Sequence, residues 1–213
     1  MRIKLTIAIP TYNRANRLDR ALNDLKGFIA ESKNRDQVSV FVSNNGSGDH
    51  TDAVIERNYM CFTSQGISFN RRKHDTNQGF DANILACYAE SPGEYIWFLS
   101  DDDNLFPGSI DAVISDIDNY EPSLIFYNHD QKPFDIQNPY IKKVDFFDDL
   151  KTENICALKK IIDWPKLSAL VVRKTTQCLN IRDNKSNFAH VSLSIVSGLA
   201  VGRVLHNSRF TAY

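Results

Sequence analysis

Three consecutive aspartates are the strongest chemical signal in this chain of 213 residues. Asp101, Asp102 and Asp103 follow the apolar run of residues 95–99 and precede a turn at residues 104–108. Adjacent carboxylates repel one another and resist burial, so a divalent cation or a cationic ligand stabilises them. Their hard oxygen atoms suit Mg²⁺ or Mn²⁺ bound to the phosphates of a substrate. A solvated acidic turn that caps the next helix explains the same residues, and the triplet alone does not decide.

Two more polar segments follow apolar, strand-like runs. Residues 10–14, which include Thr11 and Arg14, come after the first run, and the turn-forming residues 44–49 come after the second. A guanidinium such as that of Arg14 pairs with phosphate through a fixed fork of donors, although a solvated first-turn residue is the alternative. Both segments therefore add candidate anion-binding groups to the three carboxylates.

Alternating strand and helix patterns must position these loops. A sheet with repeated strand-loop-helix units is mainly parallel, has helices on both faces, and binds ligands beyond the carboxyl ends of its strands. The pattern predicts an α/β fold of one domain, with residues 130–139 as a polar insertion or mobile loop. The predicted strands are residues 5–9, 38–42, 67–69, 95–99, 123–127 and 167–172, and the predicted helices are residues 15–29, 51–59, 82–88, 110–117 and 191–199.

Composition excludes several classes of function. The formal net charge of -1 gives no general attraction to nucleic acid, so no nucleic-acid partner is expected. The four cysteines form no CxxC pair of the kind found in zinc or redox sites. Neither an apolar N-terminal signal nor a membrane-spanning run is found, which predicts a cytoplasmic protein. Peripheral contact with the inner face of the membrane stays open.

Four motifs, in this order, resemble those of the family-2 glycosyltransferases. They are residues 10–14, residues 43–49, residues 77–79 with Asn83, and residues 100–103. The resemblance covers about the first half of the chain. It implies a GT-A (Rossmann-like) fold and transfer of a sugar, with inversion, from a nucleotide-diphosphate donor to a glycan or lipid-linked acceptor, as in bacterial surface polysaccharide synthesis.

The resemblance also assigns parts of the chain to the two substrates. Residues 1–127 would form the nucleotide-sugar-binding half, and residues 128–213 the acceptor-side half of the same domain. Asn44 stands where the family usually has an aspartate that accepts a hydrogen bond from uracil, and an amide is compatible with uracil, thymine or cytosine. Helix capping by Asn77 is an equal alternative to donor contact. The implied donor-binding residues are Pro10, Thr11, Tyr12, Arg14, Asn44, Asn77, Gly79, Asp81 and Asp101.

The aspartate triplet is assigned by aligning the family motif on Pro107. Asp102 then matches the metal-binding aspartate, with Asp103 beside it as a second candidate ligand of Mn²⁺ or Mg²⁺. Ser100 stands at the motif's first aspartate, which usually approaches the ribose, so Asp101 is expected to take that role. The cation would neutralise the diphosphate leaving group as its charge develops, which makes Asp102 a catalytic residue as well.

The general base is the least clear assignment. The family commonly uses the aspartate of a Glu-Asp pair at a late helix start, and residues 187–193 contain no such pair. His190 aligns with that aspartate and is the candidate base, although a lone histidine there is more often a cap or packing residue. Asp183 is the alternative carboxylate. Two other hypotheses remain: a non-catalytic or degenerate binding module, and a sugar nucleotidyltransferase, whose first loop is generally glycine-rich with a basic residue.

Overall fold

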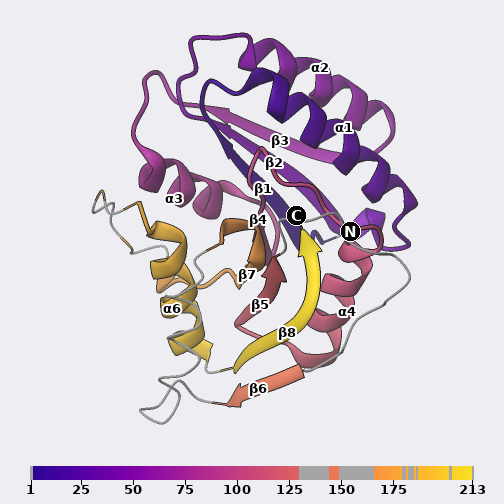
Figure 1. The fold of residues 1–213 in the computed structure, drawn as a ribbon, viewed down its shortest axis with the longest axis vertical. Helices are drawn as coiled ribbons and strands as arrows, with labels where there is room; N and C mark the ends of the chain where they lie inside the picture. The colour runs from indigo at the N-terminus through magenta and orange to yellow at the C-terminus, as the bar shows by residue number, and fades with distance from the viewer. Residues whose placement is uncertain are drawn as a thin grey trace.

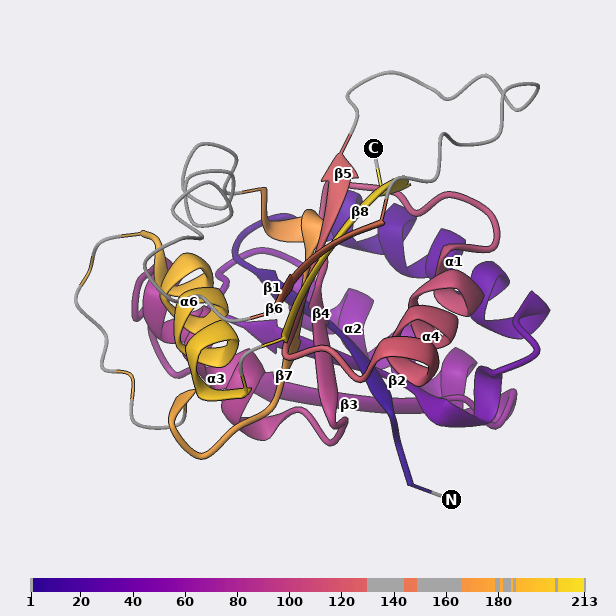
Figure 2. The same ribbon diagram turned by 90° about the horizontal axis from the view of Figure 1, so that it is seen from below.

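The computed structural model describes residues 2–129, 144–148, 166–178, 181, 185, 187–201 and 203–212. Over these residues, one eight-stranded sheet lies between two layers of helices (Figures 1 and 2). The strands are β1 (Leu5–Thr11), β2 (Val38–Asn44), β3 (Ser68–Lys73), β4 (Tyr95–Phe98), β5 (Leu124–His129), β6 (Val144–Asp148), β7 (Leu170–Arg173) and β8 (Arg203–Ala212). The helices are α1 (Ala15–Glu31), α2 (Thr51–Ser64), α3 (Phe80–Glu90), α4 (Ser109–Tyr120) and α6 (Ala189–Val201), with short 3₁₀ turns η1 (Arg35–Gln37) and η3 (Leu167–Ala169).

The sheet has the order β3-β2-β1-β4-β7-β5-β8-β6. Its first four strands are parallel, as is the pair β5 and β8, while β7 and β6 run antiparallel to their neighbours. This confirms the predicted α/β sheet, which is parallel throughout the half that carries the candidate loops. Strands β6 and β8 were not predicted, and β3 is longer than the three-residue strand that the sequence indicated.

Each face of the sheet has its own apolar core. Side chains alternate along a strand, so Leu5, Ile7 and Ile9 of β1 pack against α1, α2 and α4, while Ala8 faces α3 and α6. Leu22 on the inner stripe of α1 is fully buried, and burial of such a side chain stabilises the fold by about 1.5–3 kcal/mol. The predicted helices on both faces are confirmed, as Figure 2 shows. These two cores hold the strand ends in place beneath the candidate site.

Strand β1 continues past Pro10 to Thr11, although the predicted strand ended at residue 9. The carbonyl oxygen of Thr11 accepts a hydrogen bond from Asn45 N of the β2 side, whereas that of Ala8 accepts one from Leu99 N. Because backbone groups alternate in direction, Pro10 faces the β4 side, beyond the last β4 partner of β1. Its missing N–H therefore costs no ladder hydrogen bond, and β1 carries Thr11 up to the sheet edge.

Two predictions fall outside the described residues, namely the polar segment 130–139 and Asp183 as an alternative base. The division of the chain at residue 127 stays a prediction. In the part of the chain that is described, no helix is long and apolar enough to cross a bilayer.

Candidate functional site

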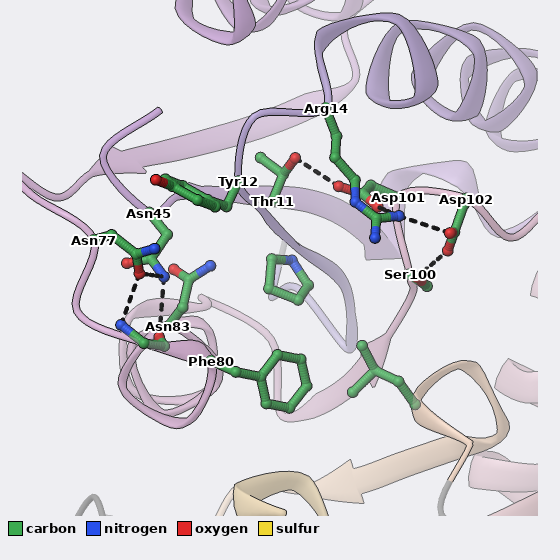
Figure 3. A pocket seen from close by; sticks show the side chains of 13 residues that line it. Thr11, Tyr12, Arg14, Asn45, Asn77, Phe80, Asn83, Ser100, Asp101 and Asp102 are labelled. Atoms are coloured by element: carbon green, nitrogen blue, oxygen red, sulfur yellow. Dashed lines mark hydrogen bonds and ion pairs between the residues drawn. The ribbon is translucent and has the colours of Figure 1, made fainter. Parts of the chain in front are cut away.

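The carboxyl ends of β1, β2 and β4 surround a cavity of about 380 Å³ (Figure 3). Two groups of side chains lie at its opposite ends in this view. The charged end consists of Arg14, Ser100, Asp101 and Asp102, and the amide end consists of Tyr12, Asn45, Asn77 and Asn83. The remaining lining residues are Pro10, Thr11, Gly79, Phe80 and Leu167.

The charged end is a hydrogen-bonded cluster around two neighbouring carboxylates. Thr11 Oγ1 donates to Asp101 Oδ2 over 2.7 Å, and Arg14 Nη1 lies 3.3 Å from Asp101 Oδ1 and 2.7 Å from Asp102 Oδ2. Ser100 Oγ donates to Asp102 Oδ1 over 2.5 Å. Residues from the ends of β1 and β4 therefore meet here, so Thr11, Arg14, Asp101 and Asp102 are brought together as the predicted parallel sheet requires.

Arg17 is a further cation at this cluster that the sequence analysis missed. Its Nη1 donates to Asp102 Oδ2 over 2.8 Å, beside the contact from Arg14. Residues three apart on a helix share one face, so the i, i+3 spacing from Arg14 was a signal that could have revealed it. Arg17 also lines a second cavity of about 750 Å³, at the starts of α1 and α2. Arg14 lines both cavities. Two guanidinium groups thus converge on one carboxylate oxygen.

The two carboxylates have pKa values shifted in opposite directions. Burial raises the pKa of Asp101, which is only 5% exposed, and the Thr11 hydrogen bond and the Arg14 charge offset this only in part. Burial also opposes ionisation of Asp102, but hydrogen bonds from Ser100 and Arg14 outweigh it and lower the pKa of that carboxyl group. The site thus holds one firmly ionised carboxylate next to one whose charge is costly, a combination more frequent at functional sites than elsewhere.

Asp101→Asn is expected to change how stability depends on pH. Because the folded-state pKa of Asp101 lies above its ordinary value of 3.8, the wild type loses stability as the pH rises from there through the folded-state pKa. Asparagine does not titrate, so the melting temperature of the variant minus that of the wild type should rise with pH in that window.

Asp111→Asn is the matched control for this titration. Burial opposes ionisation of Asp111, but hydrogen bonds from Ser32 and Asn34 prevail and lower its pKa. The wild type therefore gains stability as the pH rises towards 3.8, and the same difference should fall in this more acidic range. Melting curves from about pH 3 to about pH 7 check both signs. Slopes of one sign in both variants would contradict the raised pKa of Asp101.

Asp103 is not among the residues that line the cavity. Its Oδ2 accepts a hydrogen bond of 2.5 Å from Ser168 Oγ, and Ser168 Oγ in turn accepts one of 2.9 Å from the backbone N–H of Ser100. Asp103 therefore joins the β4 turn to η3, and the structure does not bring it to Asp102 as a second ligand. Of the two candidate metal ligands, Asp102 alone lines the cavity.

A divalent cation bound here would take one ligand from Asp102 and others from a bound substrate. Within the described residues, no group of three or more His, Cys, Asp or Glu side chains is arranged to hold a metal ion. The Asp102 side chain is 39% exposed and offers hard oxygen atoms. Magnesium ions commonly bind to one or two carboxylates and take their other ligands from phosphates and water. The residues present fit that mode of binding.

Asn44 does not line the cavity, contrary to the donor contact expected for it. It is fully buried at the end of β2, where its Nδ2 donates to Asp52 Oδ1 over 2.5 Å and its Oδ1 accepts from Ser47 N over 3.0 Å. The β1 and β2 pairing extends to Thr11 and Asn44, so the next residue, Asn45, is the first to turn into the loop. Asn45 is the β2-loop residue that lines the cavity.

Asn45 joins the β2 loop to the segment before α3. Its Nδ2 donates to Asn77 Oδ1 over 2.9 Å and to the carbonyl oxygen of Gly79 over 3.0 Å, and its Oδ1 accepts from Gln78 N over 2.9 Å. Backbone groups at both ends fix which end of the amide carries the nitrogen. An aspartate here would face the Gly79 carbonyl oxygen with a second oxygen, so this loop arrangement requires an amide at position 45.

Asp81, another expected donor contact, is buried against the start of α6 and does not line the cavity. It is 2% exposed, and its carboxylate accepts hydrogen bonds from the backbone N–H groups of Asn187 and Ala189, at 2.9 and 3.0 Å. Asn77, by contrast, lines the cavity, and its Oδ1 accepts from Gly79 N over 2.9 Å in a turn that precedes α3. Neighbouring residues of one motif thus serve different parts of the fold.

His190 lies in the first turn of α6 and is 4% exposed. Its ring meets that of Phe80 edge to face, with centroids 5.8 Å apart, and that of Phe188 at 6.3 Å. Phe80 lines the cavity, whereas His190 does not. The candidate base is therefore brought next to the cavity wall rather than onto its surface.

The chain is similar in sequence to known glycosyltransferases. The sequence profile of glycosyl transferase family 2 matches residues 6–168. Abequosyltransferase RfbV of Salmonella typhimurium is 29% identical over 115 residues, which is 54% of this chain and 33% of that protein. The GalNAc(5)-diNAcBac-PP-undecaprenol beta-1,3-glucosyltransferase of Campylobacter jejuni is 25% identical over 111 residues, 52% of this chain and 33% of that one. The chain spans about a third of the length of these curated relatives.

Solved structures share the fold over nearly the whole chain. TarS 1–349 of S. aureus in complex with UDP-GlcNAc has a TM-score of 0.72 at 14% identity, covering 99% of this chain and 58% of that one. Mannosyltransferase PcManGT of Pyrobaculum calidifontis, in complex with GDP-Man and Mn²⁺, has a TM-score of 0.67 at 13% identity, covering 98% and 55%. With the profile matching most of its length, the chain belongs to glycosyl transferase family 2 and has the GT-A fold that its motifs predicted.

Proposed function

We propose that this chain transfers a sugar, with inversion, from a nucleotide-diphosphate donor to a hydroxyl group of a glycan or lipid-linked acceptor in bacterial surface polysaccharide synthesis. The observation that carries the proposal is the convergence of Arg14, Arg17, Asp101 and Asp102 at one end of a cavity beyond the strand ends. Family membership and the names of the two curated relatives support it. We expect the protein to act in the cytoplasm, and at the inner face of the membrane where the acceptor is lipid-linked.

The donor would lie along the cavity. Its diphosphate belongs at the charged end, where Arg14 and Arg17, held by Asp102 through one Nη1 each, can donate to phosphate oxygens with their other N–H groups. Its nucleoside belongs at the amide end, beside Tyr12 and Asn45. A Mn²⁺ or Mg²⁺ ion, held by Asp102 together with the phosphates, would supply charge neutralisation of the leaving group. Asp101 is placed to accept a hydrogen bond from a hydroxyl group of the donor.

Inversion by single displacement also needs a base for the acceptor proton. We assign this role to His190, since a neutral imidazole is a competent base near pH 7 and the ring lies against the cavity residue Phe80. The acceptor would enter from the side of α6, in the half of the domain formed by residues 128–213. His190→Asn would be the corresponding test: donor affinity should be retained while turnover falls.

A thermal-shift screen tests the proposal at its first step. UDP, GDP, CDP and dTDP are compared with and without Mn²⁺, because a ligand that binds only the folded state must raise its melting temperature. One nucleotide should give a shift that Mn²⁺ enlarges. Donor hydrolysis then separates an enzyme from a binding module: metal-dependent release of nucleoside diphosphate from the matching nucleotide sugar supports the proposal. No shift with any of the four nucleotides would overturn it.

A further inference from the structure

Asp81, a residue of α3, holds the start of α6 by hydrogen bonds. It lies in the first turn of α3, 106 residues before one partner and 108 before the other. Each of its two carboxylate oxygens accepts one backbone N–H, Oδ2 from Asn187 and Oδ1 from Ala189. A carboxylate buried to this degree must be compensated by hydrogen bonds, and these two N–H groups provide such compensation.

One of these N–H groups, that of Ala189, is among those that a helix start leaves without intrahelical partners. The first N–H groups of an α-helix have no carbonyl to bind, and a negative charge near them is stabilising. Ala189 is the first residue of α6, and Asn187, two residues earlier, has a φ of 62° that turns the chain sharply into the helix. Asp81 therefore accepts from the first N–H of α6 and from an N–H of the turn before it, which ties the start of this helix to α3.

The same element reaches the cavity through the residue before Asp81. Phe80 lines the cavity, and its ring packs edge to face against His190, the second residue of α6. Figure 1 shows α3 and α6 side by side. The starts of α3 and α6 are thus joined in two ways next to the cavity wall. Asp81 accepts hydrogen bonds from the chain at the start of α6, and Phe80 packs against His190.

We propose that Asp81 is a positioning residue for the acceptor side of the site. By holding the first turn of α6, it fixes His190 and the wall that Phe80 forms, and it makes no contact with the donor. This inference rests on the proposed function, in which His190 and α6 serve the acceptor. It predicts that loss of Asp81 separates donor binding from turnover.

Asp81→Asn is the decisive variant. An amide keeps the shape but turns one acceptor into an NH₂ group that faces a backbone N–H, so one of the two hydrogen bonds to α6 is lost. We expect kcat for donor turnover to fall by about tenfold to a hundredfold, because small displacements of reacting groups have effects of this size. The Kd of the nucleoside diphosphate should stay within about twofold.

A second variant and a second readout keep the test independent of activity. Ala189→Pro removes one of the two N–H donors at a first helical position, where proline is well tolerated. Amide hydrogen exchange should be faster across residues 187–194 in both variants than in the wild type. Asp116→Asn is the control: Asp116 is as buried, accepts from Tyr127 at 2.8 Å, and lies on α4 across the sheet.

The outcomes are distinct. If Asp81→Asn weakens nucleotide binding as much as it lowers kcat, Asp81 belongs to the donor site and the inference is wrong. Amide hydrogen exchange at residues 187–194 that is no faster in the two variants than in the wild type would also overturn the inference. This readout applies even if the wild type turns over no donor. Loss of turnover in the wild type, with the exchange effect present, would instead count against the proposed function and leave the assignment of Asp81 to the start of α6 supported.

Discussion

Asp102→Asn is expected to reduce donor turnover by about a hundredfold or more, although the two side chains have nearly the same shape. Oδ2 of Asp102 accepts from Arg14 at 2.7 Å and from Arg17 at 2.8 Å, and its Oδ1 accepts from Ser100. An amide removes the negative charge that holds both guanidinium groups in place. It also removes the hard anionic ligand that a divalent cation prefers.

Two measurements separate these contributions. If Asp102 orders the two arginines, the variant should bind nucleoside diphosphate more weakly even when no divalent cation is added. If Asp102 also holds the cation, the enlargement of the thermal shift by Mn²⁺ should disappear. Binding and turnover are therefore measured with and without Mn²⁺ in the wild type and in Asp102→Asn.

Asp103→Asn is the informative comparison, because it changes the adjacent carboxylate. Asp103 bonds to Ser168 rather than lining the cavity, so its replacement should lower turnover far less than that of Asp102. Equal losses in the two variants would mean that the triplet acts as one acidic unit. The assignment of separate roles to Asp102 and Asp103 would then be wrong.

The sequence was sufficient for the features that depend on local pattern. Alternating strand and helix periods predicted the parallel sheet, and a parallel sheet places the residues after its strands on one edge. That argument alone brought Thr11, Arg14, Asp101 and Asp102 to one place, where the structure joins them by hydrogen bonds. The family motifs reinforced the same edge, since they coincide with those strand ends.

What could not be predicted depends on register and on distant partners. The residue of the β2 loop that lines the cavity comes one position after Asn44, because the pairing of β2 continues through Asn44 and leaves Asn45 to face the cavity. Asp81 is in a motif next to the site, but its partners lie more than 100 residues further along the chain. The antiparallel insertion of β7 between β4 and β5 is likewise a matter of long-range pairing, which no local period encodes.

Gly46→Ala should have the largest effect on stability among the substitutions considered. Gly46 has a φ of 72°, and a Cβ atom built on it would lie 2.6 Å from the carbonyl carbon of Thr76 and 2.9 Å from Asn77 N. The left-handed conformation costs a residue with a Cβ about 1–2 kcal/mol. Displacement of packed backbone adds about 1–3 kcal/mol, so a total of about 2–5 kcal/mol is expected.

Two control substitutions divide this loss into its causes. Gly66 has a φ of 73°, and a Cβ atom built on it would have only the end of the Arg35 side chain within 4 Å, at 3.9 Å. Gly66→Ala should therefore lose only the about 1–2 kcal/mol of the left-handed conformation. A Cβ atom built on Gly48 would have nothing within 4 Å, and the φ of Gly48 is not positive. Gly48→Ala should therefore change the free energy of unfolding by no more than about 0.5 kcal/mol. Urea unfolding of the three variants measures the differences.

The excess of Gly46→Ala over Gly66→Ala reports the close approach of the β2 loop to residues 76–77. That approach is what lets Asn45 reach Asn77 and Gly79, so the same substitution should also weaken nucleotide binding at the amide end. If Gly46→Ala is no less stable than Gly66→Ala, the two backbones do not meet in solution. The amide end of the cavity would then lose its physical basis, whereas the charged end, joined by hydrogen bonds between residues that follow β1 and β4, would stand.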